Sequence, residues 1–228
     1  MKNLHYSVSL RHVNPGRLES ACAALAEAGV DAFHVDLGDG RFTPDLGLGL
    51  GTVQVAGATG KPVHVHALME DPGRHVATMV AAGATAIYVP VESSAHVHRV
   101  LGQIREAGAA AGVAINPGTA LTKLSYLFES ADRILLLGSE PGSPARAFIG
   151  SVFERVRILQ ENLRYLKKNI PIEGEGWMTI ENAARFARFG ADSVVLDDAA
   201  FFTPEAQQDY TAALKAFRQR VILEQQLV

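Results

Sequence analysis

The amino-acid sequence predicts an α/β protein of the (β/α)8 barrel class, and three observations support this prediction. Short apolar segments rich in Val, Ile and Leu alternate with longer segments of helical spacing along the whole chain. Glycine recurs at the points where the helical segments end. The chain has 228 residues, which is enough for eight such units around one core. We therefore expect a single barrel domain over residues 1–228.

The expected strands are short and almost continuously apolar, as parallel strands are when both of their faces are buried. They are Leu4–Leu10, Ala32–Leu37, Pro62–His66, Ala86–Val91, Gly112–Ile115, Arg133–Gly138, Ile170–Ile172 and Ser193–Leu196. The segments between them repeat apolar residues at helical spacing, for example from Val152 to Leu166.

The joints between helices and strands resemble one another. The segments "EAGVDAFHV", "AAGATAIYV", "EAGAAAGVAI" and "RFGADSVVL" each place a glycine just after a helix and before a strand. Glycine ends a helix at low steric cost because it adopts the left-handed conformation. A doubly wound open sheet is the structural alternative, and eight such units without a linker favour the closed barrel.

The composition excludes several classes of function. Hydrophobic residues make up 48% and charged residues 20% of the chain, which is typical of a globular protein. The formal net charge is -3 and no basic patch stands out, so neither a nucleic acid nor an anionic membrane is an expected partner. The N-terminal residues lack the pattern of a signal peptide, and no apolar run is long enough to span a bilayer. We expect a cytoplasmic enzyme.

The ends of three expected strands carry pairs of ionisable residues spaced two apart. These pairs are His34 and Asp36, His64 and His66, and Glu173 and Glu175. Residues two apart in a strand point to the same side, and active sites of barrels lie at the C-terminal ends of the strands. Two imidazoles and two carboxylates can therefore converge there. Such a set suits zinc, iron, manganese or cobalt, and the spacing alone does not choose among them.

A structural role is the alternative for each of these residues. A lone histidine in a strand is more often a hydrogen-bonded structural residue, and we favour that interpretation for His64. The balance is reversed for His34, Asp36, His66 and Glu175 taken together. Four buried ionisable groups are costly unless they are paired or bind a ligand.

A family resemblance rests on these same residues. The segment "HVDLGDGRFTPDLGLG" resembles the second-strand signature of the ribulose-phosphate 3-epimerase family. The resemblance continues in "SVSLRHVNPGRL", "VHVHALMEDPGRHV", "AGVAINPGTAL", "GSEPGSPARAFIGSV" and "VVLDDAAFF", and it covers nearly the whole chain. It implies a TIM barrel of the ribulose-phosphate-binding type and an isomerase of carbohydrate metabolism that epimerises a sugar or sugar phosphate.

The resemblance also implies the roles of individual residues. One divalent metal ion (Zn, Fe, Mn or Co) is expected on His34, Asp36, His66 and Glu175. Asp36 and Glu175 are expected to act as the general acid and base beside a carbonyl, with an enediolate between the two proton transfers. Ser9 is expected near the substrate. A homo-oligomer is a further state that the resemblance suggests.

Some departures from the family concern the metal site and the pocket above it. The family has Asp at the position of Glu175, and the added methylene affects proton-transfer geometry more than metal binding. Leu68 and Leu137 stand where the family has methionines, and Pro90 stands where it has a histidine. Gly38 replaces another methionine and is expected to leave extra room.

The turns that bind phosphate in the family depart most. The expected substrate-binding residues Gly142 and Gly176 are retained, but the second glycine of the seventh-strand pair is Trp177, and the eighth strand ends in Asp197 and Asp198. Two carboxylates would repel a phosphate dianion at about 4 Å by several kcal/mol. The alternative is that one of them caps the last helix. We infer that a 5-phosphate is not held in the usual way.

Three functional hypotheses follow. The first is a metal-dependent epimerase of a ketose or ketose phosphate, and the second is an isomerase or lyase acting on an unphosphorylated sugar derivative. The third is a non-catalytic sugar-binding barrel, which the retained His34, Asp36 and His66 argue against. Related barrels that use an Asp-x-Lys-x-x-Asp motif are disfavoured, because no lysine lies in the second- or third-strand motifs.

Overall fold

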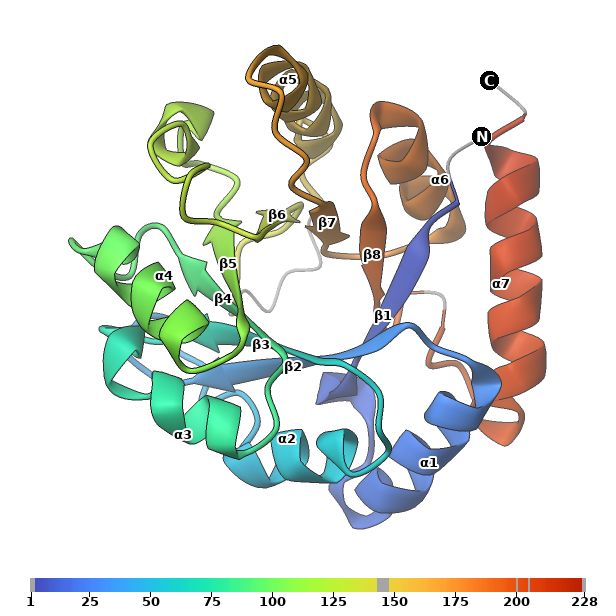
Figure 1. Cartoon of the computed structure of the whole chain (residues 1–228). Helices are drawn as coiled ribbons and strands as arrows, with labels where there is room; N and C mark the ends of the chain where they lie inside the picture. Colours follow the sequence, from blue (N-terminus) through green and yellow to red (C-terminus); the bar gives the residue numbers. More distant parts are fainter. Residues whose placement is uncertain (1–2, 143–147, 200, 205, 227–228) are drawn as a thin grey trace.

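The structure, a computed structural model, describes residues 3–142, 148–199, 201–204 and 206–226, and these form a closed barrel of eight parallel strands. The strands are β1 (His5–Ser9), β2 (Ala32–Gly38), β3 (Val63–Leu68), β4 (Ala86–Pro90), β5 (Ala110–Ile115), β6 (Arg133–Leu137), β7 (Ile172–Glu175) and β8 (Ser193–Leu196). Each strand pairs with the next in sequence, and β8 closes the ring against β1 (Figure 1). The predicted fold class is confirmed.

Helices surround this ring of strands (Figure 1). They are α1 (Leu18–Ala28), α2 (Leu50–Gly57), α3 (Val76–Ala81), α4 (Val97–Glu106), α5 (Val152–Tyr165), α6 (Ile180–Phe189) and α7 (Tyr210–Glu224). A short 3-10 helix, η4 (Leu121–Leu124), takes the place of an α-helix between β5 and β6 in the described chain. Gly29 and Gly190 end α1 and α6 in the left-handed conformation, with φ of 87° and 107°, as the sequence predicts.

The seventh strand is the one whose predicted position is wrong. It runs over Ile172–Glu175 instead of Ile170–Ile172, so both of its carboxylates lie within the strand. Glu173 and Glu175 pair in register with Leu135 and Leu137 of β6. Polar residues are tolerated within this strand because the inward face of a barrel can carry polar groups that serve a site.

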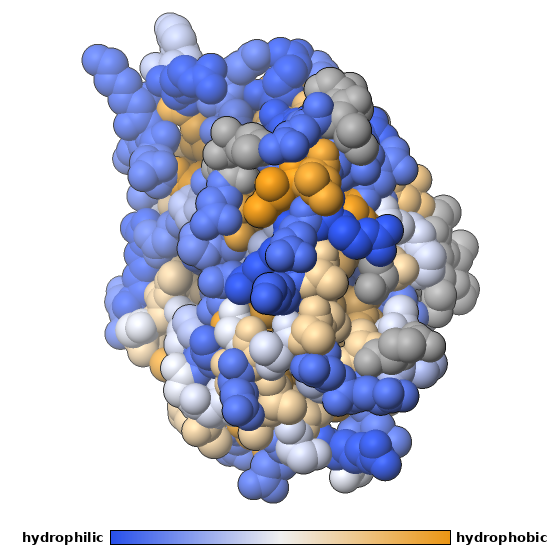
Figure 2. Space-filling model, turned by 90° about the vertical axis from the view of Figure 1, so that its right-hand side faces the viewer, coloured by the Kyte–Doolittle hydropathy of each residue, from blue (hydrophilic) through white to orange (hydrophobic). Residues whose placement is uncertain are grey.

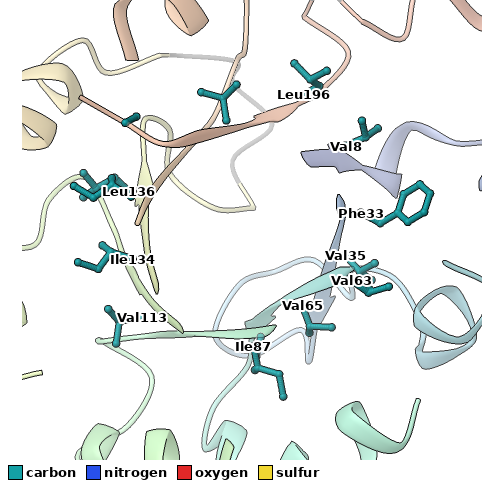
Figure 3. Close-up of a cluster of buried hydrophobic side chains, with 14 of the residues drawn as sticks. Val8, Phe33, Val35, Val63, Val65, Ile87, Val113, Ile134, Leu136 and Leu196 are labelled. Atoms are coloured by element: carbon teal, nitrogen blue, oxygen red, sulfur yellow. The ribbon is translucent and has the colours of Figure 1, made fainter. Parts of the chain in front are cut away.

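The two faces of the barrel wall differ in character. Val8, Phe33, Val35 and Ile87 are completely buried and point outward from the strands toward the helices (Figure 3). They form the main apolar core, whose burial is the dominant favourable term in folding. The residues that alternate with these outward-pointing side chains point into the barrel. They make the inward face more polar than we expected from strands that are almost continuously apolar.

The outer surface is mostly polar. Figure 2 shows the side of the molecule that carries α7, where hydrophilic residues cover most of the face and hydrophobic ones form smaller patches. Exposed large apolar side chains include Leu46, Tyr126, Tyr165 and Leu223. Along the described residues, every helix is too short or too polar to cross a lipid bilayer.

Gly174 provides a test of how the outer core holds β7 in place. An added Cβ there would lie 2.5 Å from Cε1 of Phe186, a completely buried ring of α6. We expect Gly174→Ala to lower the free energy of unfolding by about 1–3 kcal/mol, measured by urea denaturation, because the ring must leave its packed position. Adding Phe186→Leu should restore part of that loss, and a double variant less stable than Gly174→Ala alone would contradict the account.

Candidate metal centre and substrate cavity

Four ionisable side chains meet at the C-terminal mouth of the barrel. His34 and Asp36 come from β2, His66 from β3 and Glu175 from the last position of β7. One ligand atom from each lies within 4.8 Å of the others. The convergence expected from the sequence is therefore present in the structure. The closed ring brings β2, β3 and β7 around one opening, which residue spacing within a strand cannot do.

The distances place the imidazoles between the carboxylates. Nε2 of His34 lies 3.3 Å from Oδ1 of Asp36 and 3.6 Å from Oε2 of Glu175. Nδ1 of His66 lies 3.4 Å from each of the same two oxygens. His34 and His66 are at most 1% exposed, Asp36 is buried, and the side chain of Glu175 is 20% exposed. The carboxylate of Glu175 is thus the member of the set most open to solvent.

Mutual electrostatics shift the pKa values of this set. Burial alone would lower the pKa of His66, but the neighbouring carboxylates of Asp36 and Glu175 raise it to about 9. Burial would raise the pKa of Asp36, but His34 and His66 hold it well below its ordinary value. Without a metal, the group is therefore stabilised by charge pairing between imidazolium and carboxylate.

The donor set fits a divalent cation. Among the described residues, Nδ1 of His66 and Oε2 of Glu175 are buried and make no hydrogen bond, although both face the centre of the cluster. Buried polar atoms of this kind are costly unless they have a partner. Two imidazole nitrogens and two carboxylate oxygens match the ligand preferences of zinc, iron, manganese and cobalt. A divalent cation would neutralise both carboxylates.

A cavity of about 250 Å³ opens beside the four residues and includes Asp36 and Glu175 in its wall. The remaining expected substrate-binding residues all line it: Ser9, Gly142, Gly176, Asp197 and Asp198. Leu68 and Leu137 provide an apolar side of the same cavity. The structure therefore brings the predicted site residues to one place, and their binding roles stay predictions.

The sequence reasoning was wrong about the room left by Gly38. A Cβ at this position would collide with the backbone oxygen of Asp45, in the loop that follows β2. Gly38 is therefore needed for the close approach of this loop, and the space that a side chain would take is already filled by backbone.

Neither Asp197 nor Asp198, the acids after the eighth strand, caps the last helix, so the capping role considered for them from the sequence is wrong. The N-terminus of α7 is capped by Asp209, whose Oδ1 accepts from the backbone N–H of Ala212 at 2.9 Å. Asp197 instead accepts from the backbone N–H of Met178 at 3.0 Å and from that of Ala199 at 2.9 Å. Its carboxylate, which lies in the cavity wall, therefore occupies these two backbone donors.

Residues after β1 also line the cavity and were not singled out from the sequence. Arg11 makes an ion pair with Asp45, and Nδ1 of His12 lies 3.7 Å from Oδ2 of Asp198. Their positions in the loop after β1 carry a general signal, because loops at this end of a barrel build its site. Both side chains already have an acidic neighbour, so neither is free to bind an anion.

His64 and Glu173 lie away from the four-residue cluster. Both are buried one layer deeper in the barrel, where Nδ1 of His64 lies 3.4 Å from Oε2 of Glu173. The structural interpretation favoured for His64 fits this position. Both members of the pair His34 and Asp36 therefore belong to the cluster. In each of the other two pairs, the second residue belongs to the cluster and the first lies in the layer beneath it.

Comparisons with known proteins agree with this architecture. A profile described as the Ribulose-phosphate 3 epimerase family matches residues 5–201. The ribulose-phosphate 3-epimerase of Aquifex aeolicus is 35% identical over 179 residues, covering 78% of this chain and 81% of that protein. The ribulose-phosphate 3-epimerase of Synechocystis sp. is 34% identical over 229 residues, covering 99% and 98%.

A solved structure also shares the fold. The 3-hexulose-6-phosphate synthase of Salmonella typhimurium has a TM-score of 0.72 at 16% identity, and the match covers 97% of this chain and 100% of that one. At this level of identity the similarity shows a common barrel architecture and nothing of the reaction.

The raised pKa of His66 gives the site a defined pH dependence. A cation must displace the proton that this imidazole carries below about pH 9 in the metal-free protein. We expect the affinity for Zn²⁺ to rise at least tenfold per pH unit between about pH 7 and about pH 8.5, measured by competition with a chelator. An affinity that is constant over this range would contradict the assignment of His66 to the metal.

The same shift predicts the pH dependence of the metal-free protein. Because the pKa of His66 is higher in the folded state, its protonation stabilises that state. We expect this contribution to be complete below the unfolded-state pKa of about 6.5 and to be lost as the pH rises through about 9.

Proposed function

This chain belongs to the ribulose-phosphate 3 epimerase family, and on that premise we propose that it epimerises a ketose or ketose phosphate with the help of one divalent metal ion. The family is one of carbohydrate epimerases, so the enzyme class is isomerase. The observation that carries the proposal is the placement of two carboxylates and two imidazoles within 4.8 Å at the wall of a cavity.

Asp36 and Glu175 are suited to move the proton. They stand on β2 and β7, which are separated in the ring by β1 and β8, so they approach a bound substrate from different strands. Inversion of a carbon beside a carbonyl needs one group to remove a proton from one face and another to deliver a proton to the opposite face. The imidazoles of His34 and His66 lower the pKa of the adjacent Asp36 carboxyl, which keeps it ionised and able to accept a proton.

His34, Asp36, His66 and Glu175 would hold the metal. A bound divalent ion would supply positive charge to the substrate oxygens on which negative charge develops when the proton leaves. Ser9 and Gly176 line the adjacent wall of the cavity, where they can contact the rest of the substrate. Leu68 and Leu137 form an apolar side of the cavity, which would keep water from that side of a bound substrate.

A phosphorylated ketose is the first candidate substrate, because the named relatives are ribulose-phosphate 3-epimerases. An unphosphorylated ketose or related sugar derivative is the second candidate, and the position of Asp197 favours it. The carboxylate of Asp197 occupies the N–H groups of Met178 and Ala199, and Asp198 adds a second acid to the same wall. A phosphate dianion at this wall would lose those donors and meet like charge.

The remaining expectations stay predictions. The cytoplasmic location rests on the sequence pattern at the N-terminus and along the chain, and the homo-oligomer rests on the family resemblance. A sugar-binding barrel without catalysis is the functional alternative, and the experiment on Asp36 separates it from the epimerase.

Asp36→Asn removes the proposed acid or base while keeping the size of the side chain. We expect loss of solvent deuterium incorporation next to the carbonyl by a factor of about 10²–10⁴, measured by NMR in D2O with D-ribulose and D-ribulose 5-phosphate. The metal content of each sample separates lost proton transfer from lost metal.

Asp71→Asn is the matched control. Asp71 is a surface residue with a left-handed backbone, which Asn also accepts, and its variant should exchange at the wild-type rate. Exchange by Asp36→Asn at that same rate would remove Asp36 from the mechanism. No exchange by the metal-loaded wild-type protein with either sugar would favour the non-catalytic barrel.

Asp197→Asn tests the choice of substrate. The amide oxygen can still accept from Met178 and Ala199, so the change mainly removes the charge. We expect kcat/KM for D-ribulose 5-phosphate to rise about tenfold relative to that for D-ribulose, which corresponds to about 1.4 kcal/mol. An unchanged ratio, with the wild-type protein already preferring the phosphate ester, would show that Asp197 does not select against phosphate.

A further inference from the structure

A second polar layer crosses the inside of the barrel beneath the proposed metal centre. Its members are Ser7, His64, Tyr88, Arg133 and Glu173, which come from β1, β3, β4, β6 and β7. Three of them lie two residues before a residue of the site above, so they face the same side of their strands. Ser7 precedes Ser9, His64 precedes His66, and Glu173 precedes Glu175. The mechanism above uses none of the five.

Glu173 is the centre of this layer. It is completely buried, and its two carboxylate oxygens accept from Oγ of Ser7 and from Oη of Tyr88, both at 2.5 Å. Nε of Arg133 donates to Oη of Tyr88 at 2.8 Å, which leaves the tyrosine proton to donate to Glu173. A buried carboxylate is stable only when it is paired and hydrogen-bonded in this way.

These contacts join strands that share no backbone hydrogen bonds. β7 pairs only with β6 and β8, whereas Glu173 connects it to β1 and, across the barrel, to β4. Because Glu173 and Glu175 belong to the same four-residue strand, a fixed position of the first sets the height at which the second enters the cluster.

Tyr88 connects the layer to a second member of the cluster. Its ring lies nearly parallel to that of His34, with an interplanar angle of 26° and centroids 6.5 Å apart. Gly112 on the adjacent strand makes room for this ring, because a Cβ there would collide with it. Hydrogen bonds at the hydroxyl then keep the ring from shifting along the barrel axis.

We propose that Glu173 and Tyr88 are positioning residues, which fix Glu175 and His34 in the arrangement that binds the divalent ion. This inference rests on the proposed function. Residues that orient the ligands of a metal are usually worth a factor of about 10–100 in affinity when they are changed.

The test measures Co²⁺ binding to the metal-free full chain, by competition with a chelator and by the visible absorption of the bound ion. Tyr88→Phe keeps the ring and removes the hydroxyl. Glu173→Gln keeps the shape of the side chain and removes its charge. Ser7→Ala is the mildest change, because it removes only one hydrogen-bond donor to Glu173. We expect Co²⁺ affinity to fall about tenfold to a hundredfold in the first two variants, with a changed absorption spectrum, and to fall less in Ser7→Ala.

Two control variants separate positioning from general stability. Ser193→Ala changes a residue of β8 that pairs in register with Glu173 and whose Oγ makes no hydrogen bond among the described residues. Leu214→Ala removes a buried side chain of α7, which opens a cavity in the outer core and lowers Tm. Both should bind Co²⁺ as the wild-type protein does.

Co²⁺ affinities within about twofold of wild type for Tyr88→Phe and Glu173→Gln, with unchanged spectra, would overturn the positioning role alone. The positioning role would also be overturned if Leu214→Ala, at an equal loss of Tm, weakened Co²⁺ binding as much as Tyr88→Phe and Glu173→Gln do. A wild-type protein that binds no Co²⁺ would overturn both this inference and the metal dependence of the proposed function.

Discussion

Two carboxylates and two imidazoles held together inside a barrel need protons or a cation between them. In this protein the four groups of His34, Asp36, His66 and Glu175 lie within 4.8 Å, and three of them are buried. Charged imidazoles can satisfy the cluster in the metal-free protein, which is why the pKa of His66 is raised to about 9. A divalent ion satisfies it as well and leaves the carboxylates free of protons, which the proposed proton transfer requires.

The barrel supplies the geometry that this cluster depends on. Closure of β8 against β1 brings β2, β3 and β7 around one opening, and alternation along each strand turns the chosen side chains inward. The outward residues form the apolar core with the helices, so the inward face is free to be polar. The layer around Glu173 extends this polarity below the site and ties β7 to strands that it does not pair with.

Much of this could be predicted from the chain. Glycine-terminated helices and short apolar strands led to the barrel, and the spacing of His34 and Asp36 led to the cluster. The bounds of β7 could not be placed from its apolar residues alone, because Glu173 lies within the strand and its partners come from strands that only the closed ring brings near. The space at Gly38 and the partners of Asp197 depend on how loops return to the barrel mouth, which residue spacing in one segment does not specify.

The measurement that tests the central claim most directly is the position of the metal in crystals of the protein grown with Zn²⁺. Anomalous X-ray scattering at the zinc edge should show one ion per chain, with ligand atoms of His34, Asp36, His66 and Glu175 at about 2.0–2.2 Å. Replacement of His66 by Ala should remove that peak. A wild-type crystal with no ion among these four side chains, or with zinc only elsewhere on the chain, would contradict the account.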